Sequence, residues 1–280
     1  MAGGSQSIFC VAILGLGVLQ GCAQQAFFQP DRIDRGTPAD GGLAYRESDF
    51  RSEDGTRLTG WFLPARTVTD PRQAQATVIH FHGNAQNMGA HWHLVAWLCE
   101  RGFNVFTFDY RGYGRSGGTP SVAGLAADSR SALAHVRALP DVNSERLCVL
   151  GQSLGGANAI VAVAQDGGAG VKAIAIESTF ASYSSIAEEK LSFVGSLMQD
   201  EFAPEPFVAR LSPVPILFIH GTGDRVIAPS HSERLYEAAQ EPKRLILVPG
   251  AGHLDVFRGE QRETERSALV AFYREALGSS

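Results

Sequence analysis

The hydrophobic residues of this chain fall into short, nearly continuous runs separated by longer amphipathic stretches. Six of these runs are rich in Val, Ile and Phe, and they occupy residues 76–81, 103–108, 146–150, 171–176, 214–219 and 244–248. Continuous apolar runs of this length are typical of strands that are covered on both faces. The pattern therefore predicts a buried, mainly parallel sheet.

Between the runs, apolar residues recur at the spacing of helices. Leu94, Trp97 and Leu98 share one helical face, and the Ser-His-Ser-Glu sequence at 230–233 fits a capping box that begins a further helix. Strands that alternate with helices predict a doubly wound α/β fold. In such sheets, ligands bind at the carboxyl ends of the strands.

An antiparallel pair is expected before the parallel strands. Two strand-like stretches, 45–51 and 57–63, flank the Asp54-Gly55 dipeptide. Asp-Gly between alternating strand residues is a hairpin signal. We therefore expect a hairpin at one edge of the sheet.

Composition restricts the class of protein. The chain has 280 residues, 44% of them hydrophobic, and a net charge of −5. This length accommodates one large domain, and the acidic balance with no basic block gives no reason to expect a nucleic-acid partner. No metal-ligand spacing and no cofactor motif is found, so neither a metal nor a cofactor is expected.

The N-terminal stretch carries a targeting pattern. Residues 8–19 are apolar, a length too short to span a bilayer but typical of the core of a signal peptide. They end in Leu-Gln-Gly-Cys at 19–22, which resembles the lipobox of bacterial lipoproteins. The resemblance implies cleavage before Cys22 and lipidation of its sulfur.

The resulting domain prediction is a signal peptide at 1–21, a tether at 22–42 and the α/β domain at 43–280. The protein would be exported and anchored by lipid to a membrane of the bacterial envelope, on its periplasmic face. Three alternatives stay open for the N-terminal stretch: a buried structural element, secretion without lipid, and a misplaced start codon.

A serine with flanking glycines is the strongest chemical signal. Gly151-Gln-Ser153-Leu-Gly155 follows the run at 146–150 and opens a stretch of small residues that predicts a helix. A serine on such a strand-to-helix turn has an exposed hydroxyl and is a candidate nucleophile. The same pattern recurs around Ser116, but that serine lies in a glycine-rich loop with no helix beginning at it, so Ser153 is preferred.

The acid and the base are expected at the ends of two later strands. Asp224 follows the run at 214–219, and His253 follows the run at 244–248. A carboxylate orients the imidazole and stabilises the imidazolium, while the imidazole takes the serine proton. Glu177 is an alternative acid because it also follows a strand, and His231 is an alternative base, although it lies close to Asp224 in the chain.

An oxyanion hole needs two backbone N–H groups aimed at the developing negative charge. The residue after the nucleophile supplies one, which predicts Leu154. The loop after the third strand supplies the other, and there we expect the N–H of Asn84, with Gly83 allowing a close approach and His82 holding the loop.

The motifs resemble the α/β-hydrolase superfamily over residues 45–277. His-Gly-Asn-Ala at 82–85, Asp-Tyr-Arg-Gly-Tyr-Gly at 109–114 and Gly-Gln-Ser-Leu-Gly-Gly at 151–156 look like its bud-emergence-type group, which is similar to serine aminopeptidase-like hydrolases. The resemblance implies a mostly parallel eight-stranded sheet flanked by helices. It also implies that Asp109 and Arg111 brace loops around the site.

These residues together predict a serine hydrolase that cleaves carboxylic esters or thioesters of a small-molecule or acylated substrate through an acyl-enzyme. A serine peptidase, a non-catalytic binding protein of the same fold and a cofactor-free haloperoxidase stay open as alternatives. Residues 178–212 lie where hydrolases of this fold insert lids. This segment predicts a small lid with an apolar rim, or helices that only pack on the sheet.

Overall fold

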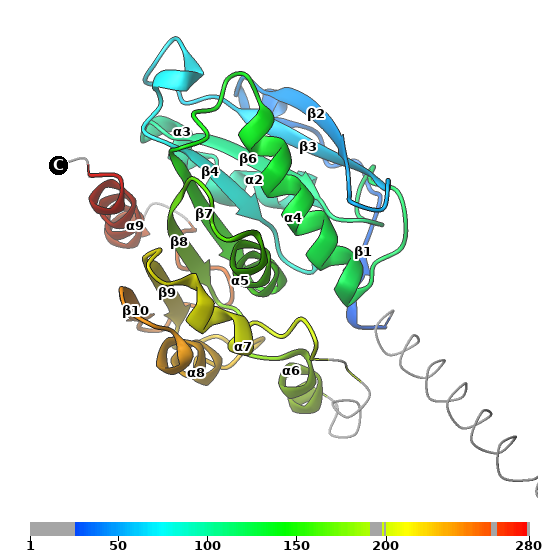
Figure 1. Ribbon diagram of the computed structural model, residues 1–280, viewed down its shortest axis with the longest axis vertical. Helices are drawn as coiled ribbons and strands as arrows, with labels where there is room; N and C mark the ends of the chain where they lie inside the picture. Colours follow the sequence, from blue (N-terminus) through cyan, green and yellow to red (C-terminus); the bar gives the residue numbers. More distant parts are fainter. Residues whose placement is uncertain (1–25, 191–197, 199, 259–261, 279–280) are drawn as a thin grey trace, which may run out of the picture.

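The computed structural model describes residues 26–190, 198, 200–258 and 262–278. Its centre is an eight-stranded sheet with the order β10-β9-β8-β7-β4-β6-β3-β2 (Figure 1). The strands are β2 (Arg46–Arg51), β3 (Arg57–Leu63), β4 (Thr77–Phe81), β6 (Asn104–Asp109), β7 (Leu147–Gln152), β8 (Val171–Glu177), β9 (Ile216–Gly221) and β10 (Lys243–Val248). All eight correspond to strands predicted from the hydrophobic pattern.

The sheet is parallel from β10 through β6 and antiparallel at the other end. β2 and β3 form the predicted hairpin, and β3 also runs antiparallel to β6. Because β7, β9 and β10 run in the same direction, the segments that follow them leave the sheet at the same edge. This α/β-hydrolase fold confirms the predicted class.

Helices cover both faces of the sheet and divide the core in two (Figure 1). The helices are α2 (Met88–Val95), α3 (Trp97–Glu100), α4 (Val122–Ala138), α5 (Leu154–Asp166), α6 (Tyr183–Lys190), α7 (Glu205–Val208), α8 (Ser230–Ala238) and α9 (Glu263–Ala276). One core cluster lies between the sheet and α4, α5 and α8, and the other lies under α2, α3 and α9. Successive strand residues alternate between them: Ile79 and Phe81 join the first, while Val78 joins the second.

The N-terminal segment differs from the predicted tether. Phe28 is 5% exposed and belongs to the core, and β1 (Gln29–Pro30) pairs in parallel with β5 (Ala85–Gln86). The segment continues through a 3-10 helix, Pro38–Gly41, in which Pro38 is buried. The stretch from Phe28 to Pro38 is therefore part of the folded domain. The predicted signal peptide and Cys22 lie outside the described residues.

The segment after β8 is short and folds against the domain. It contains α6, α7 and a 3-10 helix, Ala209–Leu211, and there is no separate cap domain among its described residues. Phe180 and Tyr183 are buried in the first core cluster, whereas residues 191–197 of the predicted rim lie outside the described part. The predicted base alternative, His231, accepts a hydrogen bond from the Ala181 N–H at 3.1 Å and thus holds this segment.

Two smaller findings complete the description. α8 begins at Ser230 as expected, but Pro229 occupies the N-cap position and no side chain caps the helix, so the predicted capping box does not form. None of the helices in the described residues is both long and apolar enough to cross a bilayer.

Candidate active site

Ser153 occupies a strained turn between β7 and α5. Its backbone has φ 54° and ψ −123°, a conformation that L-residues rarely adopt. The flanking glycines make the turn possible: a Cβ on Gly151 would lie 2.6 Å from Gly156 Cα, and one on Gly155 would lie 2.0 Å from the carbonyl oxygen of Phe81. The sequence thus forces the serine out of the sheet at its carboxyl edge.

The three residues predicted for acid–base chemistry lie together. His253 Nε2 is 3.1 Å from Ser153 Oγ, and His253 Nδ1 is 2.7 Å from Asp224 Oδ2. The serine follows β7, the aspartate follows β9 and the histidine follows β10, so three strand ends supply one continuous chain of hydrogen bonds. This is the predicted arrangement in the predicted order.

Asp224 is held by more than His253. Its Oδ1 accepts hydrogen bonds from the N–H groups of Val226 and Ile227, at 2.8 and 3.0 Å, and His220 Nε2 lies 3.2 Å from its Oδ2. Burial by itself raises the pKa of Asp224, but the hydrogen bonds from His220, His253 and the Ile227 N–H outweigh it and hold the pKa well below its usual range. These partners therefore favour the ionised form of Asp224, which is the form that can accept a hydrogen bond from His253.

Glu177, the alternative acid, does something else. It is fully buried, and its Oε1 accepts a hydrogen bond from the N–H of Val256 at 3.1 Å, in the loop that carries His253. Its Oε2 accepts from Gln152 Nε2 at 2.5 Å, and Gln152 Oε1 lies 2.8 Å from His80 Nε2. Glu177 thus fastens the histidine loop to the ends of β7 and β8 and does not contact His253.

The loop after β4 passes directly over the nucleophile. A Cβ on Gly83 would lie 3.6 Å from Ser153 Cβ, and Asn84 and Leu154 both line the cavity in front of the serine. Leu154 is the first residue of α5, so its N–H has no acceptor within the helix and adds to the positive end of the helix dipole. Both residues predicted to supply oxyanion donors therefore line the cavity that Ser153 faces.

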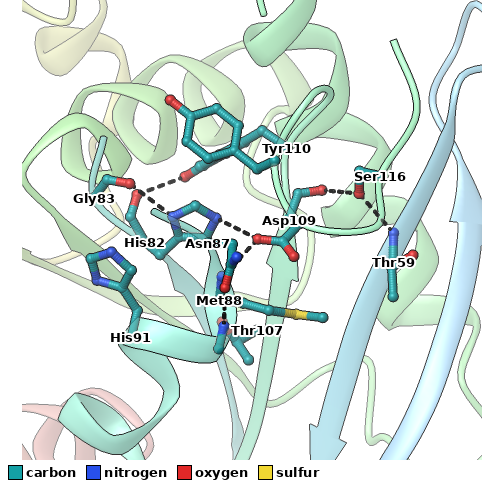
Figure 2. Close-up of polar contacts among 12 residues, drawn as sticks. Thr59, His82, Gly83, Asn87, Met88, His91, Thr107, Asp109, Tyr110 and Ser116 are labelled. Carbon is teal, nitrogen blue, oxygen red and sulfur yellow. Dashed lines mark hydrogen bonds and ion pairs between the residues drawn. The ribbon is translucent and has the colours of Figure 1, made fainter. Parts of the chain in front are cut away.

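A buried polar network fixes this loop from behind (Figure 2). Asp109 Oδ1 accepts a hydrogen bond from the N–H of Met88 at 2.7 Å and lies 3.3 Å from His82 Nε2. Ser116 Oγ donates to the carbonyl of Asp109 at 2.7 Å and accepts from the N–H of Thr59 at 3.0 Å. Ser116 is thus a structural hydroxyl, and Asp109 braces the loop as the family resemblance implies.

Arg111 braces a different loop. Its guanidinium contacts the buried carboxylate of Asp128 at 2.8 Å and that of Asp54, in the hairpin turn, also at 2.8 Å. Neither aspartate lines the cavity. Arg111 is therefore a structural residue, as expected.

A cavity of about 580 Å³ opens in front of Ser153 and His253. Its larger apolar lining side chains are Phe27, Leu154, Phe180, Ile186, Met198, Val226, Ile227 and Leu254. Among the described residues that line it, Lys190 is the only lysine or arginine, and there is no carboxylate. A volume of this size with few polar groups is typical of a small-molecule site.

Three features of the site were not predicted. His220 was not expected to contact Asp224, and nothing in the sequence separates it from an ordinary core histidine. His91 lines the cavity and its Nε2 lies 2.9 Å from the carbonyl of Ala85; burial lowers its pKa to about 3, so it is neutral. Phe27 also lines the cavity, and the Phe-Phe pair at 27–28 in an otherwise polar stretch was the available signal.

A metal site in the described part of the chain would require a group of potential metal ligands. Within the described ranges, no three His, Cys, Asp or Glu side chains group as a candidate metal site.

Known proteins resemble this chain in sequence as well as in fold. The profile of a family described as serine aminopeptidase, S33, matches residues 72–205. The uncharacterized protein YfhR of Salmonella typhi is 44% identical over 97% of this chain and 95% of its own. The alpha/beta hydrolase domain-containing protein WAV2 of Arabidopsis thaliana is 32% identical over 79% of this chain and 76% of its own.

Among solved structures, the esterase Pf2001 of Pyrococcus furiosus superposes with a TM-score of 0.70 at 22% identity, over 89% of this chain and 100% of that one. This likeness concerns the fold. The chain belongs to the α/β-hydrolase superfamily and is, at that level, a hydrolase.

Proposed function

We propose that this protein is a serine hydrolase that cleaves carboxylic ester or thioester bonds through an acyl-enzyme. The observation that carries the proposal is the position of the His253 ring, with Nε2 3.1 Å from Ser153 Oγ and Nδ1 2.7 Å from Asp224 Oδ2. These distances are within the reach that proton transfer requires.

The geometry supports the following sequence of steps. Ser153 Oγ attacks the substrate carbonyl carbon as its proton passes to His253 Nε2, while Asp224 stabilises the imidazolium. The N–H groups of Leu154 and Asn84 bind the oxyanion. The imidazolium then protonates the leaving alcohol or thiol, and an acyl-Ser153 ester remains. Water, deprotonated by the same ring, attacks that ester and releases the acid.

A second candidate, peptide hydrolysis, is favoured by the match to a family described as serine aminopeptidase. An aminopeptidase must bind a free ammonium group, which calls for a carboxylate near the nucleophile. No Asp or Glu lines the described part of the cavity, whereas Lys190 does. The cavity therefore fits an uncharged apolar acyl group better than an ammonium group.

Labelling with a fluorophosphonate tests the proposal. Wild type should react and Ser153→Ala should not, and the variant should lose on the order of 10⁴ to 10⁶ in rate on p-nitrophenyl esters and acyl thioesters. Ser116→Ala is the matched control, because Ser116 lies in the same type of motif but serves the Asp109 loop. Equal labelling of wild type and Ser153→Ala would contradict the proposal, and faster turnover of aminoacyl amides than of esters would favour the second candidate.

We also propose that the protein acts at the bacterial envelope, anchored through lipid on Cys22. The support is the apolar stretch at 8–19 followed by Leu-Gln-Gly-Cys. Several acyl chains hold a protein on a bilayer far longer than one does. This proposal is independent of the catalytic one, and substitution of Cys22 tests it.

A further inference from the structure

The N-terminal segment at 26–30 forms one side of the cavity, although it belongs to none of the eight strands of the main sheet. Ala26, Phe27 and Gln29 line the cavity together with Ser153 and with residues of the segment after β8. Phe27 is half-buried, while its neighbour Phe28 is 5% exposed and points into the core. The two adjacent rings thus have different surroundings.

The side chain of Asn84 holds this segment at the site. Asn84 Nδ2 donates to the carbonyl of Phe27 at 2.7 Å, and Asn84 Oδ1 accepts from the N–H of Gln29 at 3.1 Å and from the hydroxyl of Tyr113 at 2.9 Å. The backbone pairing of β1 with β5 continues the attachment. The residue whose N–H is proposed to bind the oxyanion therefore also fixes the position of Phe27.

Aromatic contacts connect the segment to the residues that follow β8. The ring of Phe27 lies 6.1 Å from that of Phe180 and 5.6 Å from that of Tyr183, both nearly edge to face. Phe180 lines the cavity as well, and Tyr183 begins α6. Edge-to-face pairs at these distances are favourable, so Phe27 is held in place before any substrate binds.

We infer that Phe27 is a specificity-determining residue that packs against the acyl group of the substrate and selects apolar chains of medium length over acetyl groups. This inference rests on the proposed function and names the substrate class of that site. An apolar acyl chain that packs against Phe27 and Phe180 is transferred out of water. Each methylene buried in this way raises the affinity about fourfold. On this inference an acetyl group, with its single methyl, buries little surface against the ring and gains little from it.

The experiment compares two neighbouring phenylalanines. For wild type, Phe27→Ala and Phe28→Ala, kcat/KM is measured on p-nitrophenyl octanoate and on p-nitrophenyl acetate. The octanoate-to-acetate ratio should fall about tenfold in Phe27→Ala, because the lost ring contacts only the longer chain. In Phe28→Ala the ratio should stay within twofold of wild type, even where the thermal stability falls. Since both substitutions remove a ring, Phe27→Leu and Phe28→Leu repeat the comparison with less effect on folding.

A binding measurement separates this inference from the proposed function. Octanoate binding to Ser153→Ala is compared by calorimetry with binding to Ser153→Ala carrying Phe27→Ala, and the second protein should bind about tenfold more weakly. If wild type hydrolyses neither ester, the proposed function fails while the binding result still decides the role of Phe27. Any of three outcomes would overturn the inference. The octanoate-to-acetate ratio of kcat/KM could be unchanged in Phe27→Ala, or it could fall equally in Phe28→Ala. Octanoate could also bind equally well to Ser153→Ala with and without Phe27→Ala.

Discussion

Glu177 is a fully buried carboxyl group at the end of β8, and a chain of hydrogen-bonded side chains leads to it. Thr107 Oγ1 lies 3.0 Å from His80 Nδ1, His80 Nε2 lies 2.8 Å from Gln152 Oε1, and Gln152 Nε2 donates to Glu177. Burial nevertheless raises the pKa of Glu177 to about 7, against the hydrogen bonds from Gln152 and Val256 that lower it. The residue that holds the His253 loop therefore changes charge near neutral pH.

We expect Glu177→Gln to remove a pH dependence of folding stability. Because the pKa of Glu177 rises from 4.5 to about 7 on folding, its proton stabilises the fold fully below the lower value, and this contribution is lost as pH rises through the higher one. The amide has no proton to release. The difference in free energy of unfolding between variant and wild type should therefore change across this window by up to about 3 kcal/mol.

Urea denaturation at a series of pH values measures this difference. Glu233→Gln is the matched control, because Glu233 is an exposed residue of α8 and should follow the wild-type curve. A Glu177→Gln curve parallel to that of wild type between pH about 4.5 and about 7 would show that Glu177 does not titrate in this way.

At the level of elements, the contact between α5 and β4 sets the geometry of the nucleophile. A Cβ on Gly155, in the first turn of α5, would lie 2.0 Å from the carbonyl oxygen of Phe81 and 2.6 Å from that of His82. Helix and strand can approach this closely only where one of them has no side chain. The same contact places the N–H of Leu154 next to the loop that carries Asn84.

Gly155→Ala should therefore lose both stability and activity. The helix must move away from β4, which costs about 1–3 kcal/mol as in other overpacked cores. A displacement of about 1 Å between the nucleophile and the oxyanion donors costs on the order of 10² in rate. Thermal unfolding and ester hydrolysis of the soluble variant measure the two effects.

The control for this substitution is Gly117→Ala. A Cβ on Gly117 has its nearest neighbour, the carbonyl oxygen of Arg57, at 3.6 Å, which is an ordinary contact. This variant should resemble wild type in both measurements. Full activity in Gly155→Ala would mean that α5 can shift without disturbing the site.

The strands were predictable from hydrophobic runs, but their ends were not. The runs at 103–108, 146–150 and 171–176 stop before Asp109, Gln152 and Glu177, which are the last residues of β6, β7 and β8. These polar residues remain part of the buried strands because their side chains form hydrogen bonds with buried partners. Those partners come from distant parts of the chain. The convergence of the serine, the aspartate and the histidine, by contrast, was predictable. Parallel strands bring their carboxyl ends to one edge of the sheet whatever path the loops take.

The N-terminal segment could not be placed from the sequence. It has no periodicity of its own, and its position depends on the side chain of Asn84, which is 55 residues from Gln29 along the chain. A polar stretch with Pro and Gly has the composition of a linker. The Phe27–Phe28 pair departs from that composition, and these residues enter the cavity and the core, respectively.

At the scale of the whole molecule, only a few residues of chain separate the proposed anchor from the cavity. Ala26 lines the cavity and lies four residues after Cys22. A fully extended chain of four residues spans at most roughly 14 Å. Lipid on Cys22 would therefore hold this side of the cavity within about that distance of the bilayer surface, where apolar acyl substrates are concentrated.

Substitution of Cys22 tests the anchor. Cells that express the full chain are labelled with palmitate, and the protein is followed through membrane sedimentation. Wild type should carry the label and sediment with membranes, because several acyl chains give stable attachment, and Cys22→Ala should lose both properties. Cys10→Ala is the matched control, since Cys10 lies in the segment that cleavage would remove, and it should behave as wild type. Label that persists in Cys22→Ala would exclude lipidation at this cysteine, and the cavity would then have to obtain its substrates without a fixed distance to the bilayer.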